Sequence, residues 1–70
     1  MKGYEVCYWT TGKDYTKKEY EYLNNAVEDG EAAVIFSGVI KRVTISHPLW
    51  NHYMECIKIP GDDEPEWHLI

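Results

Sequence analysis

Residues 3–11 form the first run of alternating side chains, and both of its faces are partly apolar. Val6 and Tyr8 share one face, while Cys7 and Trp9 share the other. Aromatic and β-branched residues at this density predict a strand. A strand with one face in solvent would alternate more cleanly between apolar and polar residues. We therefore expect one face to pack on a helix and the other to meet a further surface.

A helical repeat follows this strand. Tyr20, Leu23 and Val27 recur at i, i+3 and i+7, which predicts an apolar stripe on a helix over residues 17–29. Gly30 comes directly after the repeat, at a position where glycine commonly ends a helix. The stripe is narrow, as expected of one helix that lies on a small sheet.

The predicted helix start carries two further signals. Thr16 and Glu19 have the spacing of a capping box. Tyr15 and Tyr20 flank them at the positions of a hydrophobic staple, which fixes the angle at which the chain enters a helix. Both signals predict that the helix begins directly after Thr16.

Two further segments have the composition of strands. Residues 32–45 predict a hairpin, because two β-forming runs flank Ser37 and Gly38, which suit a two-residue turn. Residues 49–59 fit either a helix or a strand. We favour a strand over residues 53–59, where Tyr53, Glu55, Ile57 and Ile59 alternate with their neighbours as in a strand.

Together these elements predict an α+β fold, a small sheet with one helix packed on one face, in the order β-α-β-β-β. We expect residues 1–60 to form a single domain, followed by an acidic aromatic tail over residues 61–70. The uncovered face of the sheet predicts a homodimer, because a second subunit would bury its apolar groups. The alternative is that residues 49–59 or the tail fold back over that face.

Composition narrows the function classes. The 70 residues include three Trp and six Tyr, and seven basic against twelve acidic residues give a net charge of −5. An acidic chain is poorly suited to coat DNA phosphates, so direct nucleic-acid binding is not expected. The sequence shows neither a signal-peptide pattern nor an apolar run of membrane-spanning length. Two cysteines are too few for a secreted disulfide framework, so we expect a cytoplasmic protein without a membrane partner.

Metal and thiol chemistry have candidate residues but no supporting motif. His47, His52 and Cys56 are potential zinc ligands, yet they lack the short spacings typical of zinc sites. Cys7 and Cys56 are either a disulfide pair or two buried free thiols, and we favour the thiols. No local motif supports a Cys–His nucleophile. We therefore predict no metal site, no cofactor, no catalytic residue and no enzymatic activity.

Basic residues gather near the predicted helix start, where backbone N–H groups and the helix dipole favour anions. The candidate anion-binding residues are Lys13, Lys17, Lys18, Lys41 and Arg42. The alternative is a solvated basic edge, on which lysines also guard a strand against unwanted pairing.

The candidate partner-binding residues are aromatic or acidic: Trp9, Asp62, Asp63, Glu64, Glu66 and Trp67. Acidic side chains beside an exposed aromatic residue can steer the chain toward a basic partner and then anchor it in an apolar pocket. The alternatives for the tail are a frayed terminus and a strap in which Trp67 folds onto the core.

The layout of residues 3–46 resembles that of short accessory proteins encoded by phages of Gram-positive bacteria. The resemblance is carried by the strand ending in Tyr8-Trp9-Thr10-Thr11-Gly12, by Tyr15-Thr16-Lys17-Lys18-Glu19-Tyr20 and by the predicted hairpin. It implies a non-enzymatic protein that binds and inhibits a host protein, including components of antiviral defence. The alternatives are an oligomer that sequesters a nucleotide-like signalling molecule, a virion structural or assembly protein, and an acidic mimic of nucleic acid.

Overall fold

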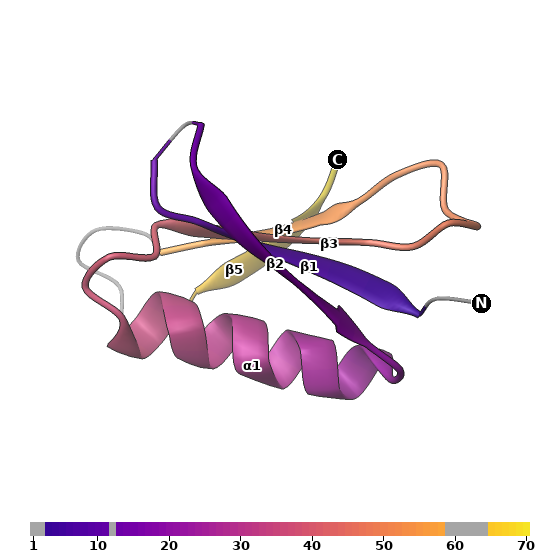
Figure 1. Ribbon diagram of the computed structural model, residues 1–70, viewed down its shortest axis with the longest axis horizontal. Coiled ribbons are helices and arrows are strands. Elements are labelled where there is room, and N and C mark those ends of the chain that lie inside the picture. The colour runs from indigo at the N-terminus through magenta and orange to yellow at the C-terminus, as the bar shows by residue number, and fades with distance from the viewer. Residues whose placement is uncertain (1–2, 12, 59–64) are drawn as a thin grey trace.

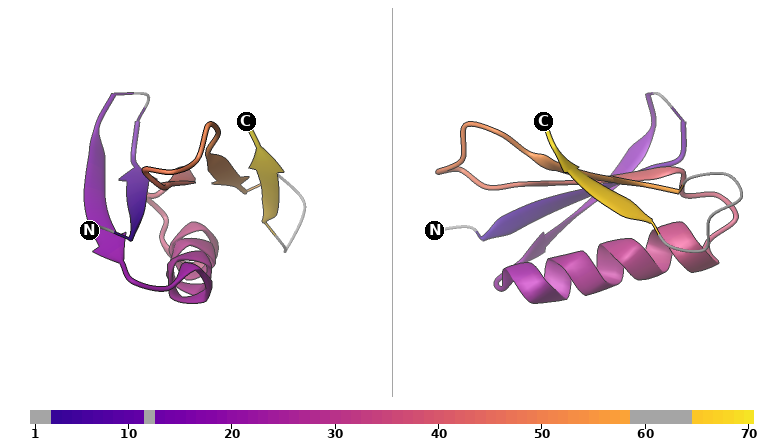
Figure 2. Two further views of the ribbon diagram at one scale, coloured as in Figure 1. Left: turned by 90° about the vertical axis from the view of Figure 1, so that its right-hand side faces the viewer. Right: turned by 180° about the vertical axis from the view of Figure 1, so that it is seen from behind.

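The computed structural model describes residues 3–11, 13–58 and 65–70 (Figure 1). Its elements are β1 (Tyr4–Trp9), β2 (Tyr15–Tyr20), α1 (Leu23–Phe36), β3 (Arg42–Ser46), β4 (Met54–Ile57) and β5 (Glu66–Leu69). The strands form one sheet in the order β2-β1-β3-β4-β5, and every neighbouring pair is antiparallel. α1 lies across one face of this sheet (Figure 2). The predicted α+β fold, with one helix on one face of a small sheet, is confirmed.

The hydrophobic core lies between α1 and the face of the sheet turned toward it. Its buried members are Val6, Tyr8, Ala26, Val34, Val43, Ile45 and Cys56. The register places Val6 opposite Ile45 and Val43 opposite Cys56, so neighbouring strands form one continuous apolar layer. Among the described residues, no helix combines the length and the apolar character that a membrane span requires.

The first correction concerns residues 15–20, which form the strand β2 and not a helix start. The order β-α-β-β-β thus describes β1, α1, β3, β4 and β5, and β2 is an additional strand. Residues 15–20 form a strand because of the turn that precedes them. The Thr10 N–H donates to the Asp14 carbonyl, and the Thr11 hydroxyl accepts bonds from two backbone N–H groups, so the chain reverses at once. β2 then pairs with β1 along all six of its residues.

The predicted capping box at Thr16 and Glu19 is therefore wrong. α1 begins six residues later than predicted, at Leu23, and its cap residue is Tyr22. The Tyr22 backbone is extended, and its side chain makes no capping hydrogen bond. Pairing with β1 satisfies a whole row of backbone groups, which outweighs a local capping signal worth about 1 kcal/mol.

Gly30 lies inside α1, so the predicted helix end at Gly30 is also wrong. Ala26, Gly30 and Val34 recur every four residues and form the buried stripe of the helix. A Cβ atom on Gly30 would lie 3.0 Å from Val43 Cγ1 and 3.4 Å from the ring of Trp67. The missing side chain allows helix and sheet to approach closely. This packing outweighs the roughly 1 kcal/mol by which glycine disfavours a helix interior.

The predicted hairpin over residues 32–45 is wrong in its first half, because α1 continues to Phe36. Ser37 ends the helix: its N–H donates to the Ala33 carbonyl. The Ser37 hydroxyl then accepts bonds from the N–H groups of Val39 and Ile40. The turn at residues 37–38 is thus real, but it joins a helix to β3.

The two ambiguous C-terminal segments both contain strands. β4 confirms the strand favoured within residues 53–59, of which residue 59 lies outside the described residues. β5 forms the far edge of the sheet, and the Trp67 Nε1–H donates to Glu31 Oε2 of α1 at 2.7 Å. Of the alternatives for Trp67, the strap onto the core is the one that the structure shows.

Candidate functional site

The face of the sheet that points away from α1 carries a mixed set of aromatic and charged side chains. We call it the open face and define it by Glu5, Cys7, Trp9, Tyr15, Lys17, Arg42, Thr44, Glu55, Ile57, Glu66 and His68. Cross-strand pairing places Tyr15, Trp9, Arg42 and Ile57 in one row across four strands. Seen from the end of the sheet, α1 covers the opposite face only (Figure 2).

Trp9 is the centre of a contact network on the open face. Its ring lies 4.5 Å from the ring of Tyr15, measured between centroids, and the Arg42 Cζ lies 4.7 Å from its centroid. The Trp9 Nε1–H donates to Thr44 Oγ1 at 3.1 Å. Arg42 Nε lies 2.8 Å from Glu55 Oε2 and forms an ion pair with it. The Nε–H group does not point at the carboxylate oxygen, so this contact is not a hydrogen bond. We call Trp9, Tyr15 and Arg42 the Trp9 cluster.

The remaining charges of this face lie around the Trp9 cluster. Lys17 Nζ lies 3.5 Å from Glu5 Oε2, and His68 Nε2 lies 3.4 Å from Glu66 Oε1. These groups are substantially exposed, so each pair contributes about 0–1 kcal/mol to stability. An aromatic centre with a charged rim is the usual anatomy of a protein-binding surface.

The cysteines are not arranged for nucleophilic chemistry. Both Cys7 and Cys56 are free thiols. Burial raises the pKa of the Cys7 thiol, against the opposing effect of its hydrogen bond with Thr44. Burial also raises the pKa of Cys56 to about 11, with a further contribution from Glu31. At neutral pH both groups are protonated, whereas a nucleophilic cysteine needs a lowered pKa.

The candidate metal ligands do not come together. His47 and His52 lie in the loop between β3 and β4, where both rings contact Trp50, at centroid distances of 5.8 and 5.0 Å. The His47 Nδ1 accepts a hydrogen bond from the Leu49 N–H. Cys56 is instead fully buried in the core. Across residues 3–11, 13–58 and 65–70, no group of three His, Cys, Asp or Glu side chains has the geometry to hold a metal ion.

The candidate anion residues are spread over different surfaces. Because α1 begins at Leu23, Lys13 and Lys17 do not surround its start. Lys17 and Lys18 point to opposite faces of β2, as neighbouring residues of a strand must. Lys41 lines a separate cleft of about 340 Å³ together with Lys58, at the C-terminal end of α1. Arg42 belongs to the Trp9 cluster.

The partner-binding candidates are divided in the same way. Trp9 and Glu66 lie on the open face, whereas Trp67 points toward α1 and is partly buried. Asp62, Asp63 and Glu64 lie outside the described residues. Of the two tryptophans in this set, Trp9 lies on the open face and Trp67 does not.

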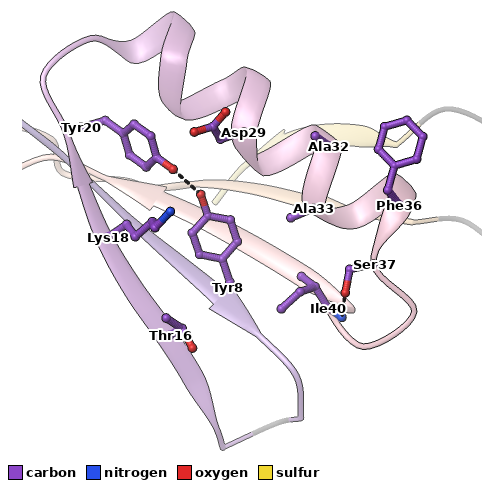
Figure 3. A pocket seen from close by; sticks show the side chains of 10 residues that line it. All are labelled: Tyr8, Thr16, Lys18, Tyr20, Asp29, Ala32, Ala33, Phe36, Ser37 and Ile40. Atoms are coloured by element: carbon purple, nitrogen blue, oxygen red, sulfur yellow. Dashed lines mark hydrogen bonds between the residues drawn. The ribbon is translucent and has the colours of Figure 1, made fainter.

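A second surface feature lies on the helix side, between β2 and α1. We call it the edge groove; it has a volume of about 680 Å³ and is lined by Tyr8, Thr16, Lys18, Tyr20, Asp29, Ala32, Ala33, Phe36, Ser37 and Ile40 (Figure 3). On its floor the hydroxyls of Tyr8 and Tyr20 lie 2.7 Å apart and share a hydrogen bond. Burial, this bond and the nearby Asp29 raise the pKa of Tyr20 well above its ordinary value. Both phenols are therefore neutral at physiological pH.

The sequence pattern does not indicate most of the edge groove. It predicts a strand at Phe36, which instead ends α1 with 82% of its surface exposed. It places Asp29 at the end of the predicted helix and indicates no binding role for it. The four-residue spacing of Ala26, Gly30 and Val34 was the signal that could have extended the helix and revealed this wall.

No family model, no curated protein and no solved structure matches this chain. The fold is a small α+β domain with one face covered by a helix, and its described residues present two surface features, the open face and the edge groove.

Proposed function

We propose that this protein is a small non-enzymatic phage accessory protein that binds and inhibits a host protein through its open face. The Trp9 cluster is the observation that carries this proposal. Trp, Tyr and Arg are the residue types in which the binding energy of protein interfaces concentrates. Here all three are adjacent on a face that α1 leaves uncovered.

The rigidity of the cluster supports the same conclusion. Thr44 fixes the Trp9 indole, Trp9 supports Tyr15 and Arg42, and Glu55 holds the Arg42 side chain. Side chains that are already ordered lose less entropy on binding, which would otherwise cost about 0.5–1.5 kcal/mol for each flexible side chain. Such preorganisation suits a surface whose task is tight binding.

The host cytoplasm is the proposed place of action, and an antiviral defence component is the proposed kind of target. Both rest on the resemblance to phage accessory proteins. The raised pKa values of Cys7 and Cys56 favour binding over thiol catalysis. The scattered placement of the five basic candidates disfavours sequestration of a nucleotide-like anion.

The test is capture of a host protein from a Gram-positive bacterial lysate, with tagged wild type and Trp9→Ala as baits. We expect one host protein that wild type retains and that Trp9→Ala loses, because truncating a central aromatic anchor costs about 2 kcal/mol or more in binding. Tyr22→Ala is the matched control, since Tyr22 is an exposed aromatic residue off the open face.

The captured protein is then purified and assayed alone. Added wild type should inhibit its activity, and Trp9→Ala should not. Tyr15→Ala serves as a second variant in case Trp9→Ala does not fold, because Tyr15 is 51% exposed on the edge strand. Equal capture by wild type and by folded open-face variants would overturn the proposal.

A further inference from the structure

Among the residues that the structure describes, no strand pairs with the outer edge of β2. β2 stands first in the strand order, with β1 as its single neighbour. Its residues are exposed from Tyr15 to Glu19. Such an edge presents a row of backbone donors and acceptors that an added strand can use.

The edge groove runs directly beside this edge. Thr16, Lys18 and Tyr20 point from β2 into the groove, and α1 forms the opposite wall (Figure 3). Every second side chain of a strand added to β2 would therefore point into the groove. An open strand edge beside a groove combines backbone pairing with side-chain selection, as in known cases of strand addition.

The groove changes in character along its length. Tyr20 and Asp29 lie together at one end, because α1 begins just after β2 ends. Lys18 lies in the middle, and among the described carboxylates none forms an ion pair with it. At the other end the walls diverge, with Thr16 on β2 and with Ser37, Ile40 and the exposed Phe36 at or just after the end of α1.

We propose that the β2 edge and the edge groove bind an extended segment of a partner protein as an added antiparallel strand. The segment has the pattern basic–x–acidic–x–apolar. The basic residue faces Asp29, the acidic residue faces Lys18, and the apolar residue packs beside Thr16. As in the proposed function, the ligand is a protein, but it binds at a different surface.

The direction of the pattern follows from the pairing. An antiparallel strand meets Tyr20 first and Thr16 last, so its basic position precedes its apolar position in sequence. All strand pairs of this sheet are antiparallel, and antiparallel pairs are also the commoner arrangement in proteins. The charges fix the register, because opposite charges attract only when the segment is in this alignment.

Binding is measured by fluorescence polarisation with full-length protein and a labelled peptide, Thr-Lys-Thr-Glu-Thr-Leu-Thr. We expect saturable binding, and at least tenfold weaker binding by the reversed-sequence peptide. Lys18→Glu should weaken binding at least tenfold, and a peptide with Lys in place of its Glu should restore it. Lys17→Glu is the matched control and should change binding less than threefold, because Lys17 points to the open face beside Glu5.

Backbone methylation tests the strand pairing itself. Two peptides carry N-methyl groups at alternate positions, one set on odd and the other on even residues. In an added strand only one set of N–H groups points at β2, so one peptide should lose binding and the other should keep it. Equal behaviour of the two peptides, or no effect of Lys18→Glu, would overturn the inference.

Two further outcomes separate this inference from its alternatives. Trp9→Ala should bind the peptide as wild type does; if the peptide fails while host capture still depends on Trp9, only the β2 inference fails. A dimer that becomes monomeric on Lys18→Glu but not on Trp9→Ala would assign the edge to a second copy of this chain. That result would also overturn the proposal of a partner segment.

Discussion

Single residues set how closely α1 can approach the sheet. Gly30 occupies the point of closest packing, opposite Val43 and the Trp67 ring, where even one methyl group has little room. Gly38 is the opposite case, since nothing lies within 4 Å of the position where its Cβ would be. The two glycines therefore form a natural comparison.

Gly30→Ala is expected to lower the free energy of unfolding by about 1 kcal/mol. Overpacking costs typically about 1–3 kcal/mol, and the better helix propensity of alanine returns up to about 1 kcal/mol. Gly38→Ala should be neutral or stabilising by up to about 1 kcal/mol. Urea unfolding of both variants measures the difference. A Gly30→Ala variant more stable than Gly38→Ala would show that the helix–sheet contact can relax.

The raised pKa of Cys56 predicts that the free energy of unfolding falls in alkaline solution. Its ordinary pKa is 9.0 and its pKa in the folded protein is raised to about 11, so the folded state holds the proton more tightly. Its contribution is fully present below pH 9 and is lost as the pH rises toward 11. With about 1.4 kcal/mol for each pKa unit, the full loss amounts to about 2–3 kcal/mol, of which about half is reached by pH 10.

Unfolding free energies measured at intervals from pH 8 to 10 test this expectation. Cys56→Ala serves as the control, because it removes this titrating group and should make the decline shallower; the decline that remains includes the contribution of Cys7, whose pKa is also raised. The raised pKa values of Tyr8 and Tyr20 add to the decline at higher pH, so the comparison stops at pH 10. Parallel curves for wild type and Cys56→Ala would contradict the prediction.

At the scale of the elements, β2 and α1 are joined without the usual capping chemistry. The N-cap position of α1 is Tyr22, which has no capping hydrogen bond, and the first turn of the helix contains no acidic residue. The helix is therefore held by its buried stripe and by its packing on β1 and β3 rather than by its ends.

Tyr22→Asp is expected to stabilise the protein by about 1 kcal/mol. An aspartate at this position can accept a bond from a free N–H group of the first turn, and its charge suits the positive end of the helix dipole. Tyr22→Ala is the control for loss of the exposed ring. Thermal unfolding measures both variants, together with Thr16→Ala, which should not change the helix content because Thr16 lies in β2 and caps no helix. A loss of helix content on Thr16→Ala would contradict this expectation.

For the whole molecule, the central question is what covers the open face. The sheet has five strands, and α1 covers one of its two faces. We propose that a second copy pairs through this face when the host protein is absent, as a two-fold homodimer. The two occupants would then compete for the Trp9 cluster.

Light scattering at micromolar concentration should give twice the 8.2 kDa mass of one chain. Trp9→Ala should give a monomer, because it removes the centre of the shared surface. Tyr22→Ala, off this surface, should remain dimeric. A monomeric wild type that persists on concentration would exclude the homodimer and leave the host protein as the occupant of the open face.

The sequence by itself determined the parts of the fold that depend on side-chain alternation and composition. The first strand, the presence of one helix, a strand within residues 53–59 and the α+β class all follow from periodicity, because burial on one face demands it. The position of Trp9 on the face opposite Val6 and Tyr8 followed in the same way. That alternation is local, so it is readable without knowing the partners.

Tertiary structure decided those features for which the local sequence pattern indicates a different conformation. Residues 15–20 carry a helix-start pattern, yet the turn before them delivers them to β1, and a complete strand pairing outweighs one cap. Gly30 looks like a helix end, yet the sheet beneath it requires a position without a side chain. Trp67 looks like a free anchor, yet β4 and Glu31 provide its place on the core. The edge groove exists only because β2 and α1 are neighbours in space, which no local pattern specifies.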